Sequence, residues 1–235
     1  DPIPDTDRVE LQHAADLINA SKKPFALVGQ GVELGNAQSE LLAFLEKADI
    51  PCGRTLLGLS AVPSDCRLNK GMLGMHGNLG PNVKTNECDV LIAIGMRFDD
   101  RVTGNLDTYA KQSKIIHLDI DPSEIGKNVK VDVPVLGDCK ETLAELTKLI
   151  REAKHTEWID SFAAYEQKEF EQVIEKEVYP KEGPLNMGEV VNAVSEATRH
   201  EAVLVTDVGQ NQMMSARYFK YTKNRSIVTS GGLGT

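Results

Sequence analysis

The sequence predicts an α/β fold in which helices cover both faces of a parallel sheet, and three observations support this prediction. Short, continuous apolar runs recur along the chain, segments with the apolar spacing of helices separate them, and polar or glycine-rich turns follow several of the runs. Continuous apolar runs are typical of strands that are buried on both faces. Their alternation with helices is typical of strand–helix–strand units.

The apolar runs that have the length of strands are 25–28, 90–94, 115–118, 133–136 and 202–205. We expect two more strands, one that ends near Arg54 and one at 226–229. Apolar residues at helical spacing predict helices over 8–19, 37–47 and 140–150. In the last of these, Leu143, Leu146 and Leu149 recur every three residues, which places them on one side of the helix.

Composition divides the chain into three parts. We assign residues 1–152 to a central Rossmann-like domain and residues 153–183 to a helical linker. The stretch 151–181 is rich in Glu, Lys and Gln, and its apolar residues are widely spaced, which is typical of an exposed helix. Residues 184–235 then begin a second α/β domain, whose first helix has Asn186 as its N-cap and Glu189 at the matching position of a capping box. A single strand–helix–strand unit cannot close a core, so we expect this second domain to be incomplete.

Charge and composition exclude several classes of function. The 235 residues carry a net charge of -9, and 41% are apolar and 26% charged, so no broad basic field is available for nucleic acid or an anionic membrane. No apolar stretch reaches the roughly 20 residues that span a bilayer. The acidic, proline-rich start is neither a signal nor a transit peptide. Four cysteines without a C-x-x-C pair favour a reduced, cytoplasmic location and argue against zinc.

The first candidate site is the turn after the first predicted strand, where Gly29, Gly31 and Gly35 are separated by one and three residues. The dinucleotide fingerprint G-x-G-x-x-G would have its third glycine one residue earlier and an acidic residue about 20 positions on. Arg54 occupies the end of the next strand instead. Two interpretations stay open: a tight turn, or a dinucleotide site that differs from the usual nicotinamide mode.

Two further candidates are glycine-rich and charged loops. The run 71–78 has glycine at a density that permits close contact with a planar ligand, and His76 within it is either a structural hydrogen-bonding group or a functional one. In 95–104, two arginines and two aspartates follow an apolar strand, so the loop is either a pyrophosphate site or a salt-bridged surface loop.

Acidic residues follow the next two strands. Asp119 is placed to bind a ribose hydroxyl, but Asp121 is equally placed to cap a following helix, with Glu124 three residues later. Asp138 is expected to be the N-cap of the helix at 140–150. The polar turn 206–213 and the glycine-rich run 230–235 are candidate phosphate sites in the second domain.

Together these motifs resemble one family over essentially the whole chain. V-G-Q-N-Q-M and S-G-G-L-G-T are similar to the start of the diphosphate-binding domain of thiamine-diphosphate-dependent acetolactate (acetohydroxyacid) synthase large subunits. G-M-L-G-M-H-G, G-M-R-F-D-D-R-V-T-G and H-L-D-I-D-P-S-E-I-G-K-N resemble the central FAD-binding domain of the same family. The resemblance implies a transferase that joins pyruvate to pyruvate or 2-ketobutyrate with loss of carbon dioxide, in branched-chain amino-acid biosynthesis, and a flavin that performs no net redox chemistry.

Carried over position by position, the resemblance implies two sets of cofactor-binding residues. The FAD contacts would be Gly29, Gln30, Gly31, Thr55, Leu56, Leu57, Leu73, Gly74, Met75, His76, Gly95, Met96, Arg97, Asp99, Arg101, Val102, Asp119, Ile120, Glu124, Asp138 and Cys139. The thiamine diphosphate contacts would be Val208, Gly209, Gln210, Asn211 and Gly234. The family often has His at the position of Asn211 and Trp at that of Met214, so the chain departs from the pattern there.

The resemblance also implies what this stretch lacks. In the family, the catalytic glutamate belongs to a preceding domain, and the magnesium motif would follow the last residue here. We therefore expect no catalytic and no metal-binding residue in this chain. We also expect no synthase activity from this chain alone. The implied partners are a second large subunit, in a homodimer or tetramer, and a regulatory small subunit. The alternatives are another FAD- and thiamine-diphosphate-dependent decarboxylase, oxidase or carboligase, a nicotinamide-binding Rossmann module, and a binding module without chemistry.

Overall fold

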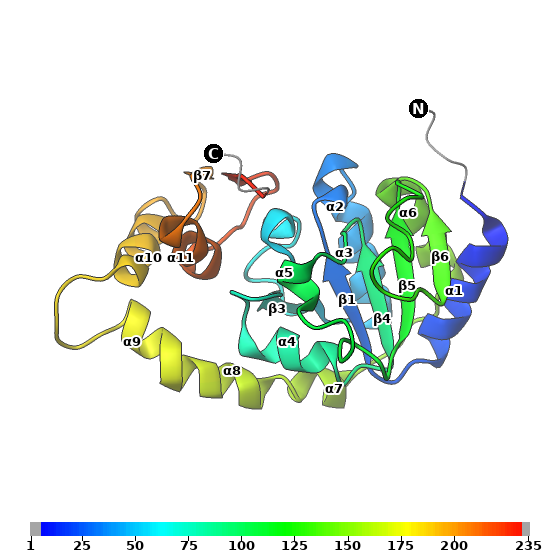
Figure 1. Cartoon of the computed structure of the whole chain (residues 1–235), viewed down its shortest axis with the longest axis horizontal. Coiled ribbons are helices and arrows are strands. Elements are labelled where there is room, and N and C mark those ends of the chain that lie inside the picture. The colour runs from blue at the N-terminus through cyan, green and yellow to red at the C-terminus, as the bar shows by residue number, and fades with distance from the viewer. Residues whose placement is uncertain (1–5, 232–235) are drawn as a thin grey trace.

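The computed structural model describes residues 6–231 and contains two sheets (Figure 1). The larger sheet has six strands in the order β3-β2-β1-β4-β5-β6, and every neighbouring pair is parallel. Its strands are β1 (Pro24–Val28), β2 (Cys52–Arg54), β3 (Asn69–Met72), β4 (Val90–Ile94), β5 (Lys114–Asp119) and β6 (Val133–Leu136). The predicted parallel α/β class is confirmed.

Two helical layers bury the six-stranded sheet. One face packs against α1 (Arg8–Ala20), α3 (Gln38–Ala48) and α6 (Cys139–Leu149). The other face carries α4 (Leu79–Thr85), α5 (Asp100–Thr103) and α7 (Thr156–Asp160). The central strands are buried throughout, with Ala26 and Ile92 in the first core and Leu27 and Leu91 in the second. This burial on both faces explains why their apolar runs are continuous.

The segment after α6 differs from the single exposed helix expected from its sequence. It is divided into α7, α8 (Ala163–Glu169), the π-helical turn η2 (Phe170–Ile174) and α9 (Glu175–Val178), which extend toward the second unit (Figure 1). Trp158, Ile159 and Phe162 are buried in the cores of the large sheet. The prediction of an exposed linker was therefore wrong for the first part of the segment, because its widely spaced apolar residues form a packing face.

The second unit contains α10 (Met187–Ala197), α11 (Gln210–Tyr218) and the parallel pair β7 (Leu204–Thr206) and β8 (Ile227–Thr229). Asn186 and Glu189 form the predicted capping box, in which Asn186 Oδ1 accepts from Glu189 N at 3.1 Å and Glu189 Oε2 accepts from Asn186 N at 3.0 Å. The small core of this unit includes Leu59 and Met72 from the first unit. The two units therefore pack against each other.

Candidate cofactor-binding site

Residues predicted to bind FAD follow each of the six strands of the large sheet. Because all six strands are parallel, their carboxyl ends meet at one edge of the sheet. The order β3-β2-β1-β4-β5-β6 reverses between β1 and β4, and ligands of open α/β sheets bind at such a reversal. The predicted set runs from Gly29 to Cys139, which are 110 positions apart in the sequence. The fold brings these residues to a common edge of the sheet.

The loops after β1 and β4 touch through their backbones at this reversal. Gly29 N donates to Ile94 O at 2.9 Å, and Gly31 N donates to Gly95 O at 2.9 Å. A Cβ atom on Gly29 would lie 2.3 Å from Gly95 O, and one on Gly31 would lie 2.6 Å from Gly95 Cα. Gly95 itself has φ +58, a left-handed conformation that favours glycine. The approach of the two loops requires these glycines, which gives the tight-turn interpretation a physical basis.

The arginines of the 95–104 loop are exposed. Arg97 and Arg101 side chains have 63% and 64% of their surface accessible, and their ion pairs with Asp99 and Asp100 are long, at 3.9 Å. Asp99 instead caps the short helix α5, accepting from Arg101 N at 3.0 Å and Val102 N at 3.3 Å. Exposed ion pairs of this length contribute little stability. Both guanidinium groups are therefore oriented by weak contacts and are accessible to an anionic ligand.

The glycine-rich run 71–78 begins as strand β3, which the sequence did not reveal, and continues as a loop after Met72. Gly71 and Gly74 have φ of +113 and +96. Met75 N donates to Arg101 O at 2.8 Å, so this loop lies against the 95–104 loop. Met75 is 60% exposed. The structure thus joins two predicted FAD loops and leaves an apolar side chain accessible beside them.

The segment after β5 corrects one prediction. Asp121 does not cap a helix, because residues 122–128, all within the described part of the chain, form turns; its carboxylate accepts from Ser123 N at 2.8 Å. Glu124 pairs with Lys127 at 2.7 Å. Gly126, with φ +72, takes the chain out of the helical region. Ile120 in the same segment is 46% exposed.

Asp119 is mostly buried, and its carboxylate faces its own loop. Its Oδ1 accepts from Asp121 N at 2.9 Å, and its Oδ2 lies 3.6 Å from Nε2 of His117. His117 Nε2 also lies 2.9 Å from Met96 O, so this fully buried ring supports the main chain of the 95–104 loop. The carboxylate of Asp119 thus holds its own loop, and the neighbouring ring of His117 contacts the 95–104 loop.

Several predicted contact residues have buried side chains. Asp138 is the N-cap of α6, as predicted, and accepts from Lys140 N at 2.8 Å. Cys139, Leu73 and Met96 are buried. Burial raises the pKa of the Cys139 thiol to about 12, and the nearby charges of Asp138 and Asp119 act in the same direction. The side chains of Leu73, Met96 and Cys139 are therefore not exposed at the edge of the sheet.

The predicted thiamine diphosphate residues 208–211 lie in the turn after β7 and in the first turn of α11. Gly209 has φ +137, and Gln210 begins α11. Sequence reasoning missed Gln212, whose Nε2 donates to Thr229 Oγ1 at 2.7 Å and Ser230 O at 2.8 Å and so joins α11 to the end of β8. Gly234 lies outside the described residues. Gly231 contacts the first unit, since a Cβ there would lie 2.7 Å from Cδ1 of Leu57.

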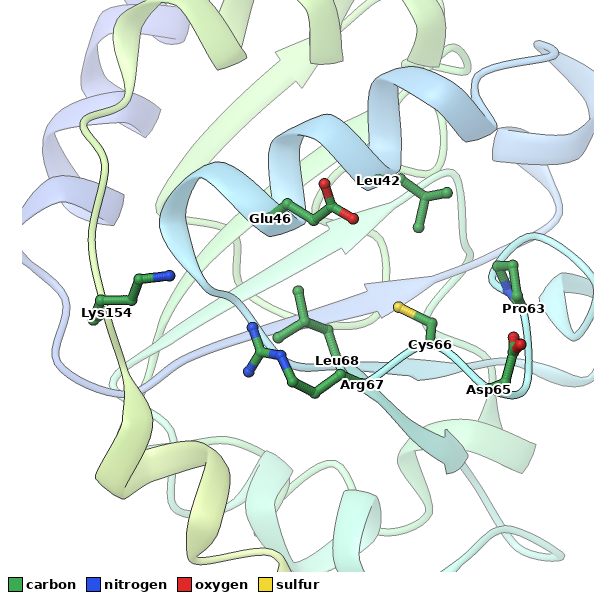
Figure 2. A pocket seen from close by; sticks show the side chains of 8 residues that line it. All are labelled: Leu42, Glu46, Pro63, Asp65, Cys66, Arg67, Leu68 and Lys154. Atoms are coloured by element: carbon green, nitrogen blue, oxygen red, sulfur yellow. The ribbon is translucent and has the colours of Figure 1, made fainter.

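A pocket of about 560 Å³ lies elsewhere, beside α3 and the segment that enters edge strand β3 (Figure 2). Arg67 and Leu68 directly precede β3, whereas the predicted loops follow the strands. Its charged lining mixes both signs, and the residues are Leu42, Glu46, Pro63, Asp65, Cys66, Arg67, Leu68 and Lys154. This position separates it from the predicted phosphate sites.

Within residues 6–231, no group of three or more His, Cys, Asp or Glu side chains is arranged to hold a metal ion. No helix of the described part of the chain is long and apolar enough to cross a membrane.

The sequence pattern of the family described as "Thiamine pyrophosphate enzyme, central domain" matches residues 11–146, which contain all six strands of the large sheet and all of the predicted FAD residues. The chain belongs to the thiamine pyrophosphate enzymes. Its six-stranded parallel sheet agrees with the central domain of such an enzyme.

Curated relatives of this thiamine pyrophosphate enzyme extend the match into the second unit. It is 42% identical over 234 residues to the "Probable acetolactate synthase large subunit" of Methanocaldococcus jannaschii, covering 97% of this chain and 39% of the relative. It is 37% and 38% identical to the acetolactate synthase large subunits of Lactococcus lactis and Corynebacterium glutamicum, covering 96% of this chain and 39% and 36% of the relatives. The chain thus spans about two fifths of the length of the relatives it matches.

Proposed function

We propose that this chain is part of an acetolactate synthase large subunit, a transferase that joins pyruvate to pyruvate or 2-ketobutyrate with loss of carbon dioxide. The observation that carries the proposal is the identity of about 40% to acetolactate synthases from distant organisms, which extends over 96–97% of the chain and across both units. The matched stretch includes both predicted cofactor segments in the same order. We place the reaction in branched-chain amino-acid biosynthesis and in the cytoplasm, where the four free cysteines would remain reduced.

We propose that FAD binds at the edge where the loops after β1 and β4 meet. Arg97 and Arg101 would contact the pyrophosphate, because their forks suit two phosphate oxygens and neither is held by a close ion pair. The exposed apolar side chains of Met75 and Ile120 would contact the planar rings. Buried residues of the predicted set, such as Met96 and Cys139, would contribute main-chain contacts only.

We propose that thiamine diphosphate binds at the second unit, where Gly209 and Gln210 begin α11. When bound, this cofactor supplies the electron sink for the decarboxylation of a 2-keto acid. Gln212 would keep the end of β8 beside that turn through its bonds to Thr229 and Ser230. Mg²⁺ would accompany the diphosphate through ligands outside this stretch, and a second large subunit and a regulatory small subunit are the proposed partners.

Flavin titration tests the site. We expect FAD fluorescence to report saturable binding to the complete protein. Arg97→Ala should weaken it roughly 10- to 100-fold, since one charge-assisted hydrogen bond contributes about 1.5–3 kcal/mol. Arg151→Ala, which removes an exposed arginine in the connection after α6, is the matched control and should leave the affinity unchanged. Displacement of FAD by NADH would contradict the proposal and favour a nicotinamide-binding module.

A nicotinamide module is the less favoured alternative because of Arg54. The position that would need an acidic ribose ligand after β2 holds this arginine, which is buried and donates to Leu59 O at 2.6 Å and Val62 O at 3.0 Å. Acetolactate formation from pyruvate by the complete protein, measured with thiamine diphosphate and Mg²⁺, distinguishes the synthase from a related decarboxylase or oxidase. The 235-residue chain alone is expected to form none.

A further inference from the structure

One side chain of the second unit enters the first unit next to a predicted FAD loop. Arg217, in the last turn of α11, donates through Nη1 to His76 O at 3.0 Å and Gly77 O at 2.8 Å. Its Nη2 donates to Glu169 Oε1 at 2.7 Å. Only 15% of the arginine side chain and 8% of the glutamate side chain are exposed. Three acceptors from two segments thus surround a largely buried guanidinium.

Glu169, the last residue of α8, also binds the end of the same loop. Its Oε2 accepts from Leu79 N, the first residue of α4, at 2.9 Å, and its Oε1 accepts from Asn78 Nδ2 at 3.2 Å. Asn78 Oδ1 in turn accepts from Met72 N at the end of β3 at 2.8 Å. A buried ion pair is costly unless its remaining hydrogen-bonding groups are satisfied, and here they are. The pair therefore fixes where the loop after β3 begins and ends.

The loop that Arg217 holds is also joined to the exposed arginines of the 95–104 loop. Met75 N donates to Arg101 O at 2.8 Å, and a Cβ on Gly74 would lie 2.5 Å from that same oxygen. Loops packed this closely at the backbone cannot move independently. A shift of the main chain at His76 and Gly77 would therefore move Met75 and the backbone of Arg101.

At its other end, α11 begins in the predicted thiamine diphosphate segment. The helix is nine residues long, and Arg217 follows Gln210 by seven positions, or about 10 Å of helix. A helix of this length moves as one body, so a change of position at Gln210 is transmitted to the guanidinium. Arg217 is thus joined by a helix to one predicted cofactor site and by hydrogen bonds to the other.

We propose that Arg217 is a positioning residue that couples the thiamine diphosphate site to the flavin site. The inference rests on the proposed function, because it needs both cofactors. A cofactor that orders α11 would also order the loop at 73–77, and the second cofactor would then bind a loop that is already ordered. The guanidinium reaches the loop carbonyls through Nη1 and Glu169 through Nη2, whereas the three donors of lysine share a single nitrogen and can replace this arrangement only in part.

The test is the FAD dissociation constant of the complete protein, measured with and without saturating thiamine diphosphate and Mg²⁺. The coupling factor is the dissociation constant of FAD without thiamine diphosphate divided by that with it. Linkage requires FAD to change the affinity for thiamine diphosphate by the same factor. We expect a wild-type factor of about 5 or more in favour of binding. Arg217→Met should reduce it to about 1, Glu169→Gln should reduce it partly, and Arg217→Lys should restore part of the loss.

Lys223→Met is the matched control, because it removes a charge from the second unit in an exposed ion pair with Glu201 and should keep the wild-type factor. A coupling factor of 1 in the wild-type protein overturns the inference and leaves the proposed function intact. So does a wild-type coupling factor in a folded Arg217→Met variant. If Arg217→Met does not fold, full coupling in both Glu169→Gln and Arg217→Lys overturns it. Absence of FAD binding to the wild-type protein overturns the proposed function and this inference together.

Discussion

The indole nitrogen of Trp158 donates a hydrogen bond to the main-chain oxygen of Pro24 at 2.8 Å. This contact joins the segment after α6 to the first residue of β1, 134 positions earlier. The ring of Phe162 packs edge-on against the indole at 5.4 Å, and Lys84 Nζ lies 4.8 Å from its centroid. The connection to the second unit therefore starts from the core of the first sheet.

Replacement of Trp158 should destabilise the first unit strongly. Trp158→Ala removes a buried aromatic side chain, and such changes cost about 3–5 kcal/mol. Trp158→Phe keeps a ring but leaves Pro24 O without its donor, so we expect a loss of about 1–3 kcal/mol. Urea unfolding followed by far-ultraviolet circular dichroism measures both, since the wild-type chain has a single tryptophan and fluorescence is lost with it. Glu157→Ala, at an exposed neighbour, should be neutral, and an equal effect of all three changes would contradict the assignment.

Two glycine-to-alanine changes should have unequal effects on stability. Gly29→Ala places a Cβ 2.3 Å from Gly95 O, so we expect a loss of about 1–3 kcal/mol, together with weaker FAD binding as the two loops separate. Gly80→Ala, within α4, places a Cβ no closer than 3.6 Å to any non-adjacent neighbour. The gain in helix propensity is offset because Pro81 follows and disfavours the helical region for a residue with a Cβ, so we expect a change within about 0.5 kcal/mol. Thermal denaturation of the pair tests this. A stable Gly29→Ala variant with unchanged flavin affinity would show that the loops need not approach so closely.

Glu33 should make the protein less stable as pH rises. Burial raises the pKa of this carboxyl above its ordinary value of 4.5, and the hydrogen bond from Ser60 and the charge of Arg225 offset burial only in part. The folded state binds this proton more tightly than the unfolded state. The free energy of unfolding therefore falls as pH rises from 4.5 through the raised pKa. Glu33→Gln keeps an acceptor for Ser60 and should be more stable than the wild-type protein at neutral pH, with the difference vanishing below pH 4.5. A difference that grows in acid would refute this sign.

Asp49 should have the opposite dependence on pH. Burial by itself would raise its pKa, but hydrogen bonds from Arg67 and from His155 N outweigh burial and lower the pKa below 3.8. Stability from this carboxylate is therefore present above pH 3.8 and is lost as pH falls through the lowered value. We expect Asp49→Asn to lose about 1.5–3 kcal/mol at neutral pH. Chemical denaturation at decreasing pH should show the two proteins converging, and a constant difference would exclude the charged contact as its cause.

Local sequence determined much of the fold. The bounds of β4 and β6 agree with the apolar runs, and the caps at Asp138 and Asn186 agree with their expected roles. These features depend on residues within a few positions of one another. The predicted class followed as well, because burial of the central strands on both faces appears directly as continuous apolar sequence.

Edge elements and turns were less predictable. Strand β3 has a single buried residue, Met72, because it lies at the edge of the sheet, and so it has no apolar run to reveal it. The turn after Asp121 has the acidic pattern of a helix start but no following apolar face to stabilise a helix. In both segments the local signal was missing or ambiguous, and the tertiary environment decided the structure.

By itself, the sequence determined the parallel α/β class, most of its strands, the helix caps at Asp138 and Asn186 and the loops that resemble cofactor sites. Only the tertiary structure decided that Arg217 donates a hydrogen bond to Gly77, 140 positions earlier, and that Trp158 donates one to Pro24. The physical reason is that periodicity reports which face of an element is buried, whereas the partner of a polar group depends on how the elements pack. Arg217 has no local pattern that names its acceptors, and they appear only once α11, α8 and the loop after β3 lie together.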